Sequence, residues 1–126
     1  MKIGLLGFGV VGRGVYEITE NRDDMQVTKV LCLEDIKLPD AQAVHNIRDI
    51  VEDDSIDTVV EAMGGLHPAY DFVRAAVEAG KNVVTSNKAL VADKGRELMD
   101  IAREKSINFL FEASCGGGIP IIRVIN

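Results

Sequence analysis

The chain has 126 residues, the length of one domain, and 47% of them are hydrophobic, which is enough for a sizeable core. Its net charge of −6 argues against nucleic acid or an anionic membrane surface as a partner. No stretch reaches the roughly 20 apolar residues of a membrane span. The two cysteines show no metal or redox spacing, which is typical of a protein of the reducing cytoplasm.

The N-terminal segment carries the strongest local pattern. An apolar run predicts a strand over Lys2–Leu6, and a helical pattern follows over Val10–Glu20. Between them stands a G-x-G-x-x-G motif, which in a strand–turn–helix context is typical of dinucleotide-binding sites. The first glycine permits the tight turn, the second lets the pyrophosphate approach the backbone, and the third lets helix and strand pack closely. The predicted cofactor-binding residues of this segment are Gly7, Phe8, Gly9, Val10, Val11 and Gly12.

Strand and helix signals alternate along the rest of the chain. They predict strands over 27–33, 43–44, 58–62, Asn82–Thr85 and 107–111. They predict helices over 47–52, from Pro68 to the residue before Gly80, and from a cap at Asp93 to about Lys105. This alternation indicates an α/β fold, a Rossmann-type doubly wound parallel sheet with strand order 3-2-1-4-5-6. The ligand of such a sheet is expected at the carboxyl ends of the strands, beside the first strand.

The end of the second strand bears on the choice of cofactor. An acidic residue at this place binds the adenosine ribose hydroxyls in dinucleotide folds, and Glu34 stands 22 residues after Gly12, with Asp35 next to it. A carboxylate there repels the 2′-phosphate of NADP, so NAD is the predicted cofactor, whereas Lys37 could reach a phosphate. The alternative interpretation is that Glu34 and Asp35 form a solvated pair in a loop.

The loops after the fourth and fifth strands also carry candidate residues. After the fourth strand, small residues would let the diphosphate and the nicotinamide ribose approach the backbone. The predicted cofactor-binding residues of this loop are Ala62, Met63, Gly64 and Gly65. Ser86 and Lys88 follow the fifth strand and are predicted to lie at the cofactor, near the nicotinamide. A lysine there could hold a substrate carboxylate or polarise a carbonyl, or could simply be solvated. His67, beside Pro68, is expected to have a local structural role and not that of a catalytic base.

The segment after the sixth strand offers oxygen ligands and a thiol. Glu112 adds a carboxylate to the carbonyls exposed by three consecutive glycines, and hard cations accept such ligands. Cys115 could alternatively act as a nucleophile on an aldehyde, although no base stands near it in the sequence. The apolar residues after Pro120 need a surface to cover. We therefore expect the chain to be a dinucleotide-binding domain from a longer protein, with a connection to a further domain beginning at about residue 119.

Four motifs together closely resemble the homoserine dehydrogenase family. They are LGFGVVG over 6–12, EAMGG over 61–65 with Pro68 and Ala69 after it, VVTSNKAL over 83–90, and FEASCGGGIPII over 111–122. The resemblance runs over nearly the whole chain. It implies the N-terminal nucleotide-binding domain of an NAD(P)-dependent oxidoreductase that interconverts L-homoserine and L-aspartate 4-semialdehyde, on the route to threonine, methionine and isoleucine.

The resemblance also implies roles for particular residues. It makes Lys88 a catalytic residue near the nicotinamide and the substrate. It further implies a sodium ion held chiefly by main-chain oxygens, at the positions Glu112, Cys115, Gly117 and Ile119. Many members carry an arginine that serves NADP at the end of the second strand, whereas this chain has Glu34 after Leu33, which supports NAD.

The family's second domain supplies the substrate-binding carboxylates, another catalytic lysine and the dimer interface. The resemblance therefore implies that the whole protein forms a homo-oligomer and acts on a small amino-acid substrate. The 126-residue chain by itself is expected to bind the nicotinamide dinucleotide without turning over that substrate.

Two alternatives from other functional classes remain open. The first is a fragment of an acylating aldehyde dehydrogenase that uses Cys115, which thiol alkylation with and without substrate would test. The second is a non-enzymatic dinucleotide-sensing domain. Such a sensor would need a segment that binds DNA or a partner protein, and this acidic sequence shows none.

Overall fold

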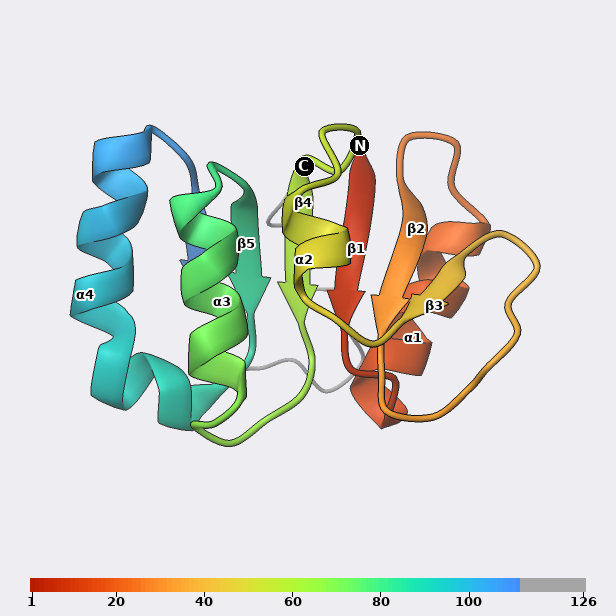
Figure 1. The fold of residues 1–126 in the computed structure, drawn as a ribbon, viewed down its shortest axis with the longest axis horizontal. Helices are drawn as coiled ribbons and strands as arrows, with labels where there is room; N and C mark the ends of the chain where they lie inside the picture. Colours follow the sequence, from red (N-terminus) through yellow and green to blue (C-terminus); the bar gives the residue numbers. More distant parts are fainter. Residues whose placement is uncertain (112–126) are drawn as a thin grey trace.

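The computed structural model describes residues 1–111, which form a six-stranded sheet in the order β3-β2-β1-β4-β5-β6. Every neighbouring pair of strands is parallel, so the predicted order 3-2-1-4-5-6 is confirmed. The strands are β1 (Lys2–Leu6), β2 (Gln26–Leu31), β3 (Gln42–Val44), β4 (Thr58–Glu61), β5 (Asn82–Thr85) and β6 (Phe109–Phe111). Strands β1, β2, β4 and β5 all point to the lower edge of the sheet in Figure 1.

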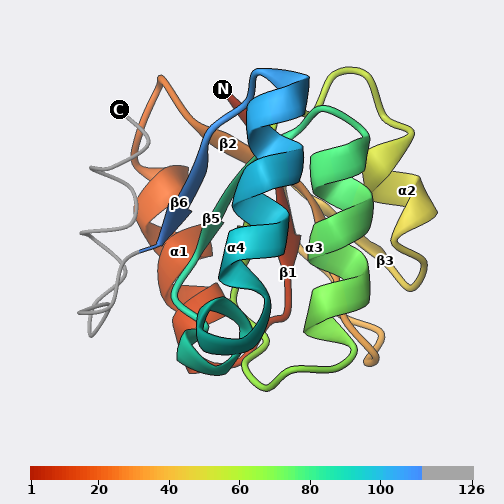
Figure 2. The ribbon, with the colours of Figure 1, turned by 90° about the vertical axis from the view of Figure 1, so that its left-hand side faces the viewer.

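Helices cover both faces of this sheet. They are α1 (Val10–Glu20), α2 (Arg48–Val51), α3 (Ala69–Glu78) and α4 (Lys88–Lys105). Figure 2 shows α1 on one side of the sheet and α3 and α4 on the other. Successive side chains of a strand point to opposite faces, so Val83 packs in the core beside α3 and α4 while Val84 packs in the core beside α1. Burial on both faces explains why the strands read as continuous apolar runs.

The predicted elements agree with the structure except at a few boundaries. Strand β2 ends at Leu31 instead of residue 33, and the side chain of Leu33 is 99% exposed. The predicted helix cap at Asp93 is wrong, because α4 begins five residues earlier, at Lys88. The Asn87 side chain accepts a hydrogen bond from the backbone N–H of Leu90 (3.1 Å) and caps the helix there. Lys88 is therefore the first residue of a helix and does not lie in a loop.

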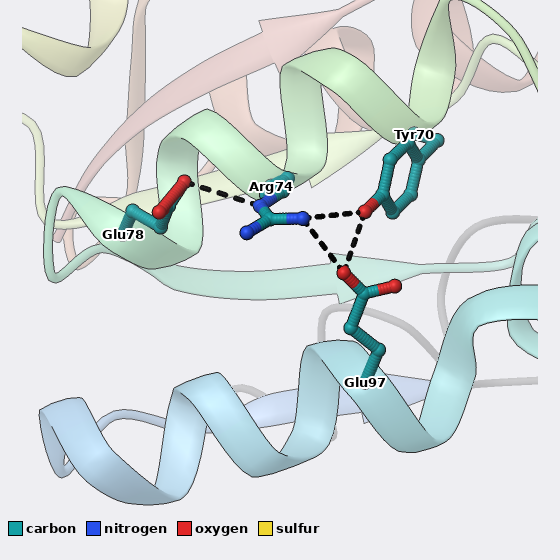
Figure 3. A network of polar contacts seen from close by, with 4 residues as sticks. All are labelled: Tyr70, Arg74, Glu78 and Glu97. Carbon is teal, nitrogen blue, oxygen red and sulfur yellow. Dashed lines mark hydrogen bonds and ion pairs between the residues drawn. The ribbon is translucent and has the colours of Figure 1, made fainter.

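A polar network joins α3 to α4 on the outer surface (Figure 3). The Arg74 guanidinium donates through Nη1 to Glu97 Oε1 (2.7 Å) and to the Tyr70 hydroxyl (2.9 Å), and that hydroxyl donates to the same Glu97 oxygen (2.7 Å). The Arg74 Nε atom also contacts Glu78 one turn along α3 (3.3 Å). A single exposed ion pair contributes little, but these shared contacts set how the two helices lie against each other.

The carboxylate of Asp53, in the loop between α2 and β4, links that loop to β2. Its Oδ1 atom accepts hydrogen bonds from the Ser55 hydroxyl (2.6 Å) and backbone N–H (2.9 Å), and its Oδ2 atom pairs with Lys29 Nζ (3.1 Å). The Ser55 hydroxyl first, and then Lys29, lower the pKa of Asp53 from its ordinary 3.8 to about 2. The ionised carboxylate is therefore stabilised in the folded chain.

We predict that Asp53→Asn makes folding less sensitive to acid. Because the folded pKa of Asp53 is depressed, its contribution is present above pH 4 and is lost as the pH falls toward 2. After allowance for partial exposure, that contribution is about 1 kcal/mol. Urea unfolding at pH 6, 4 and 2.5 checks this. Asp54→Asn is the matched control, since its exposed side chain makes no hydrogen bond or ion pair within residues 1–111. Equal acid sensitivity of the wild type and Asp53→Asn would contradict the prediction.

Candidate functional site

The glycine motif forms the turn between β1 and α1, and the structure shows why two of its glycines are needed. Gly7 has a positive φ of 95°, and a Cβ atom there would lie 3.0 Å from Met63 Cγ and 3.1 Å from the Ala62 carbonyl oxygen. A Cβ atom on Gly12 would overlap the carbonyl oxygen of Gly7. Nothing lies within 4 Å of the corresponding position on Gly9, so this face of the loop is open. A phosphate can approach the backbone there.

Helix α1 begins directly after this turn, and no side chain caps its N-terminus. Gly9 occupies the cap position, and the first turn of the helix carries no acidic residue. The first backbone N–H groups of an α-helix have no acceptor within the helix, and the helix dipole favours an anion at this end. Val10, the first helical residue, is 91% exposed. The glycine turn and the helix start together provide the groups that hold a pyrophosphate in dinucleotide folds.

A crevice of about 550 Å³ opens beside this turn, at the carboxyl ends of β1, β2 and β4. This volume falls in the range of small-molecule sites. Of the residues predicted from the sequence, the crevice is lined by Gly7, Phe8, Gly9, Glu34, Ala62 and Met63. The remaining predicted cofactor residues do not line it: Val10, Val11, Gly12, Gly64, Gly65, Ser86 and Lys88. The structure thus brings the glycine turn, the end of β2 and the loop after β4 around one space.

A buried carboxylate that the sequence analysis missed organises the loop after β4. Glu61, the last residue of that strand, is fully buried. Its Oε2 atom accepts hydrogen bonds from the backbone N–H groups of Met63 (2.8 Å) and Gly64 (3.1 Å). Its Oε1 atom accepts one from the Thr85 hydroxyl (2.5 Å), and the Asn87 side-chain amide lies 3.4 Å from Oε2. All four contacts are donors, as an acceptor-only carboxylate requires.

The Glu61 network connects the crevice wall to the start of α4. The Asn87 amide that approaches Glu61 also donates to the Gly65 carbonyl oxygen, while the Asn87 carbonyl oxygen caps the helix that begins with Lys88. Gly64 and Gly65 both have positive φ, 79° and 75°, so the turn needs glycine at these positions. A glutamate at the end of an otherwise apolar strand was the sequence signal that could have revealed this role.

Other predicted positions lie apart from the crevice. Lys88 is exposed on the first turn of α4, and Ser86 is half-buried between β5 and that helix. His67 is exposed, with its Nδ1 atom 3.6 Å from Asp71 Oδ2 and its ring edge-on to Tyr70, which agrees with the local structural role predicted for it. The predicted metal positions Glu112, Cys115, Gly117 and Ile119 lie outside the described residues. Within residues 1–111, no group of three or more His, Cys, Asp or Glu side chains could hold a metal ion.

The other cysteine lines the crevice. The Cys32 thiol donates to the Glu34 carbonyl oxygen (3.1 Å), and burial raises the pKa of the thiol. A raised pKa keeps the thiol protonated near neutral pH, and the thiolate is the nucleophilic form. Cys32 is therefore a half-buried wall residue whose environment favours the protonated thiol.

Comparison with known families identifies the architecture. The family described as "Homoserine dehydrogenase, NAD binding domain" matches residues 7–112. This chain belongs to that family. The chain is accordingly a nicotinamide dinucleotide-binding domain, and the match favours the homoserine dehydrogenase interpretation over the aldehyde dehydrogenase and sensor alternatives.

Full-length relatives and solved structures agree with the family assignment. The chain is 34% identical to homoserine dehydrogenase of Bacillus subtilis, with 99% of this chain and 32% of the relative covered. It is 37% identical to that of Synechocystis, with 98% and 31% covered. A crystal structure of Staphylococcus aureus homoserine dehydrogenase superposes with a TM-score of 0.80 at 35% identity, over 90% of this chain and 32% of the other. The chain thus spans about a third of these relatives.

A more distant structure shows how widely the fold is used. Biliverdin reductase of Synechocystis superposes with a TM-score of 0.74 at 20% identity, which is evidence for the fold alone.

None of the helices in residues 1–111 is long and apolar enough to cross a membrane.

We predict that Glu61→Ala strongly destabilises the fold. The substitution removes a fully buried carboxylate that accepts hydrogen bonds from four donors. Each buried donor left without an acceptor lowers the free energy of unfolding by about 1–3 kcal/mol before relaxation. Allowing for relaxation, the free energy of unfolding should fall by about 3 kcal/mol or more. Glu61→Gln, which keeps one accepting oxygen, should lose less. Urea unfolding checks this, with the exposed Glu104→Ala as the control. A loss below about 0.5 kcal/mol in Glu61→Ala would show that the network contributes little.

Proposed function

We propose that the chain is the cofactor-binding part of an oxidoreductase that transfers a hydride between a nicotinamide dinucleotide and the pair L-homoserine and L-aspartate 4-semialdehyde. The observation that carries the proposal is the crevice at the carboxyl ends of β1, β2 and β4, against an uncapped helix start. It lies where the strand order reverses beside β1, the place at which open α/β sheets bind their ligands. The longer relatives are named homoserine dehydrogenase, which supplies homoserine, and the family resemblance supplies L-aspartate 4-semialdehyde.

The dinucleotide is proposed to lie across the edge of the sheet. The diphosphate contacts Gly9 and the backbone N–H groups that begin α1. The adenosine ribose lies toward Glu34 after β2, and the nicotinamide lies toward the loop after β4, with Lys88 and Ser86 on the far side. This orientation follows the polarity of the glycine turn and of the second strand in dinucleotide folds. A cytoplasmic location and a homo-oligomeric whole protein belong to the same proposal.

The proposal assigns the choice between NAD and NADP to Glu34. This exposed residue lines the crevice just beyond the end of β2. Its carboxylate can accept hydrogen bonds from two ribose hydroxyls, whereas the 2′-phosphate of NADP would meet a like charge. Lys37 is also exposed in the same loop but does not line the crevice.

We predict that the chain binds NAD about tenfold more tightly than NADP, a difference of about 1.4 kcal/mol. Glu34→Gln should reduce this ratio several-fold, mainly by tightening NADP, because the like-charge repulsion is removed. Isothermal titration calorimetry at pH 8 measures both dissociation constants. Asp54→Asn is the matched control, since its exposed side chain makes no hydrogen bond or ion pair within residues 1–111 and does not line the crevice. Equal affinities of the wild type for NAD and NADP would contradict the role given to Glu34 and would direct attention to Lys37 as the residue that sets the cofactor preference.

We also predict that the 126-residue chain binds the dinucleotide but does not oxidise homoserine. Hydride transfer needs the substrate at near-attack distance and a group that takes the hydroxyl proton, and a misplacement of about 1 Å can cost ~100-fold. A single lysine, Lys88, cannot orient a carboxylate, an ammonium and a hydroxyl together. Nicotinamide absorbance should therefore stay at background with homoserine and NAD, in a sample whose NAD binding has been measured. Substantial turnover would mean that these residues complete the active site.

A second assay tests the role proposed for Lys88. In a longer protein that continues this chain through a substrate domain, the same assay should give turnover, and Lys88→Ala should lower kcat. Lys94→Ala, also on α4 but over the Tyr70 ring at 5.3 Å, is the matched control and should leave kcat nearly unchanged. An unchanged kcat in Lys88→Ala would remove Lys88 from the catalytic machinery.

A further inference from the structure

His45 directly follows β3 and lines the crevice together with Glu34. Its ring is held on both sides. The Nδ1 atom lies 2.8 Å from the backbone carbonyl oxygen of Cys32, and the Nε2 atom lies 3.0 Å from Asp35 Oδ1. The carbonyl of Cys32 is well placed to anchor the ring, because the N–H of the same residue is bonded to the Val44 carbonyl at the end of β3 (3.1 Å).

The two partners of the His45 ring determine its protonation state. A carbonyl oxygen and a carboxylate oxygen are both acceptors, but a neutral imidazole has a single N–H to donate. The doubly protonated imidazolium alone satisfies both contacts. In agreement, the pKa of His45 is raised above its ordinary 6.5, first by the hydrogen bond to the Cys32 carbonyl and then by Asp35. A positive charge at this end of the crevice, beside Glu34, is therefore favoured to a higher pH than on an ordinary histidine.

The other charged and titratable groups around this end come from two elements. The segment after β2 contributes Glu34, Asp35 and the Cys32 thiol, whose pKa is raised by burial. Helix α1 contributes the guanidinium of Arg13, which lies over the Phe8 ring at 5.5 Å from its centroid. Histidine is the side chain whose charge ordinarily changes near physiological pH, so His45 is the titrating cation of this cluster.

We propose that His45 is a specificity-determining residue, which makes the discrimination between NAD and NADP depend on pH. The inference rests on the proposed cofactor site. When His45 is protonated, its charge partly offsets the repulsion between Glu34 and a 2′-phosphate. When it is neutral, Glu34 acts unopposed and NADP is excluded more strongly. NAD has hydroxyl groups at this end of the molecule, so its affinity changes little.

The expected effect is modest, because His45 is half-exposed. A unit charge several ångströms from a phosphate, largely in water, changes its binding by about three- to tenfold, and less at high salt. The side chain of Asp35 is 98% exposed, so its pairing with His45 contributes little by itself. The backbone contact to Cys32 is therefore the main anchor of the charge.

The test compares the dissociation constants of NAD and NADP between pH 5.5 and 8.5 at fixed ionic strength. In the wild-type chain, the ratio of the NADP constant to the NAD constant should rise three- to tenfold more over this range than in His45→Gln. Glutamine keeps a side-chain amide donor but does not titrate. The slope that remains in His45→Gln reports the ionisation of the 2′-phosphate itself, near pH 6. His67→Gln, at the exposed second histidine, is the matched control and should keep the wild-type slope.

A structural readout accompanies the binding data. The chain contains two histidines, so His67→Gln assigns the His45 ring signals in a proton NMR titration. The His45 signal should titrate above pH 6.5 in the chain without nucleotide, and Asp35→Asn should lower its midpoint slightly. Equal pH slopes in the wild type and His45→Gln, or a midpoint at or below 6.5, would overturn this inference and leave the cofactor site standing. If the wild type bound neither nucleotide, the proposed function itself would fail, and this inference with it.

Discussion

The carboxylate of Glu61 is the contact on which the candidate site most depends. Where β4 ends, the sheet no longer supplies acceptors to the backbone N–H groups, and buried N–H groups without partners are costly. Glu61 accepts from two of them and also binds Thr85 on the neighbouring strand. The turn that results places Met63 directly beside Gly7, so the wall of the crevice and the glycine turn have to fit together. A single buried side chain thus holds together the ends of β4 and β5 and the start of α4.

The parallel direction of the strands brings the other crevice residues to the same edge of the sheet. Because β1, β2, β3 and β4 run in the same direction, the residues that follow them meet at one edge of the sheet. The uncapped start of α1 attracts an anion at the middle of that edge, while Glu34 and His45 line its outer end. A chain with net negative charge can therefore hold an anionic cofactor, since the attraction is local and comes from backbone dipoles.

Sequence reasoning was accurate where local chemistry decides the structure. The first strand, the glycine turn and α1 were predicted to the residue, because apolar runs, glycine spacing and helical periodicity are local signals. The predicted cap at Asp93 failed for a local reason as well. Asn87 is an equally good cap, and the residues after it are good helix formers, so the longer helix is favoured. The end of β2 was predicted too late, because apolar character alone does not distinguish a buried Leu31 from the exposed Leu33.

The sequence by itself determined the fold class, the strand order and the family, and it predicted a site in segments that line one crevice: the glycine turn, Glu34 and the loop after β4. These follow from periodicity and from motifs whose spacing is set by backbone geometry. Only the tertiary structure decided the roles of Glu61 and His45. Glu61 reads as one charged residue among 20 acidic ones until its strand is placed between β1 and β5. His45 acquires its two acceptors from a segment ten or more residues away, across the β2–β3 pair. Such partners depend on which strands lie side by side, and no local pattern records that.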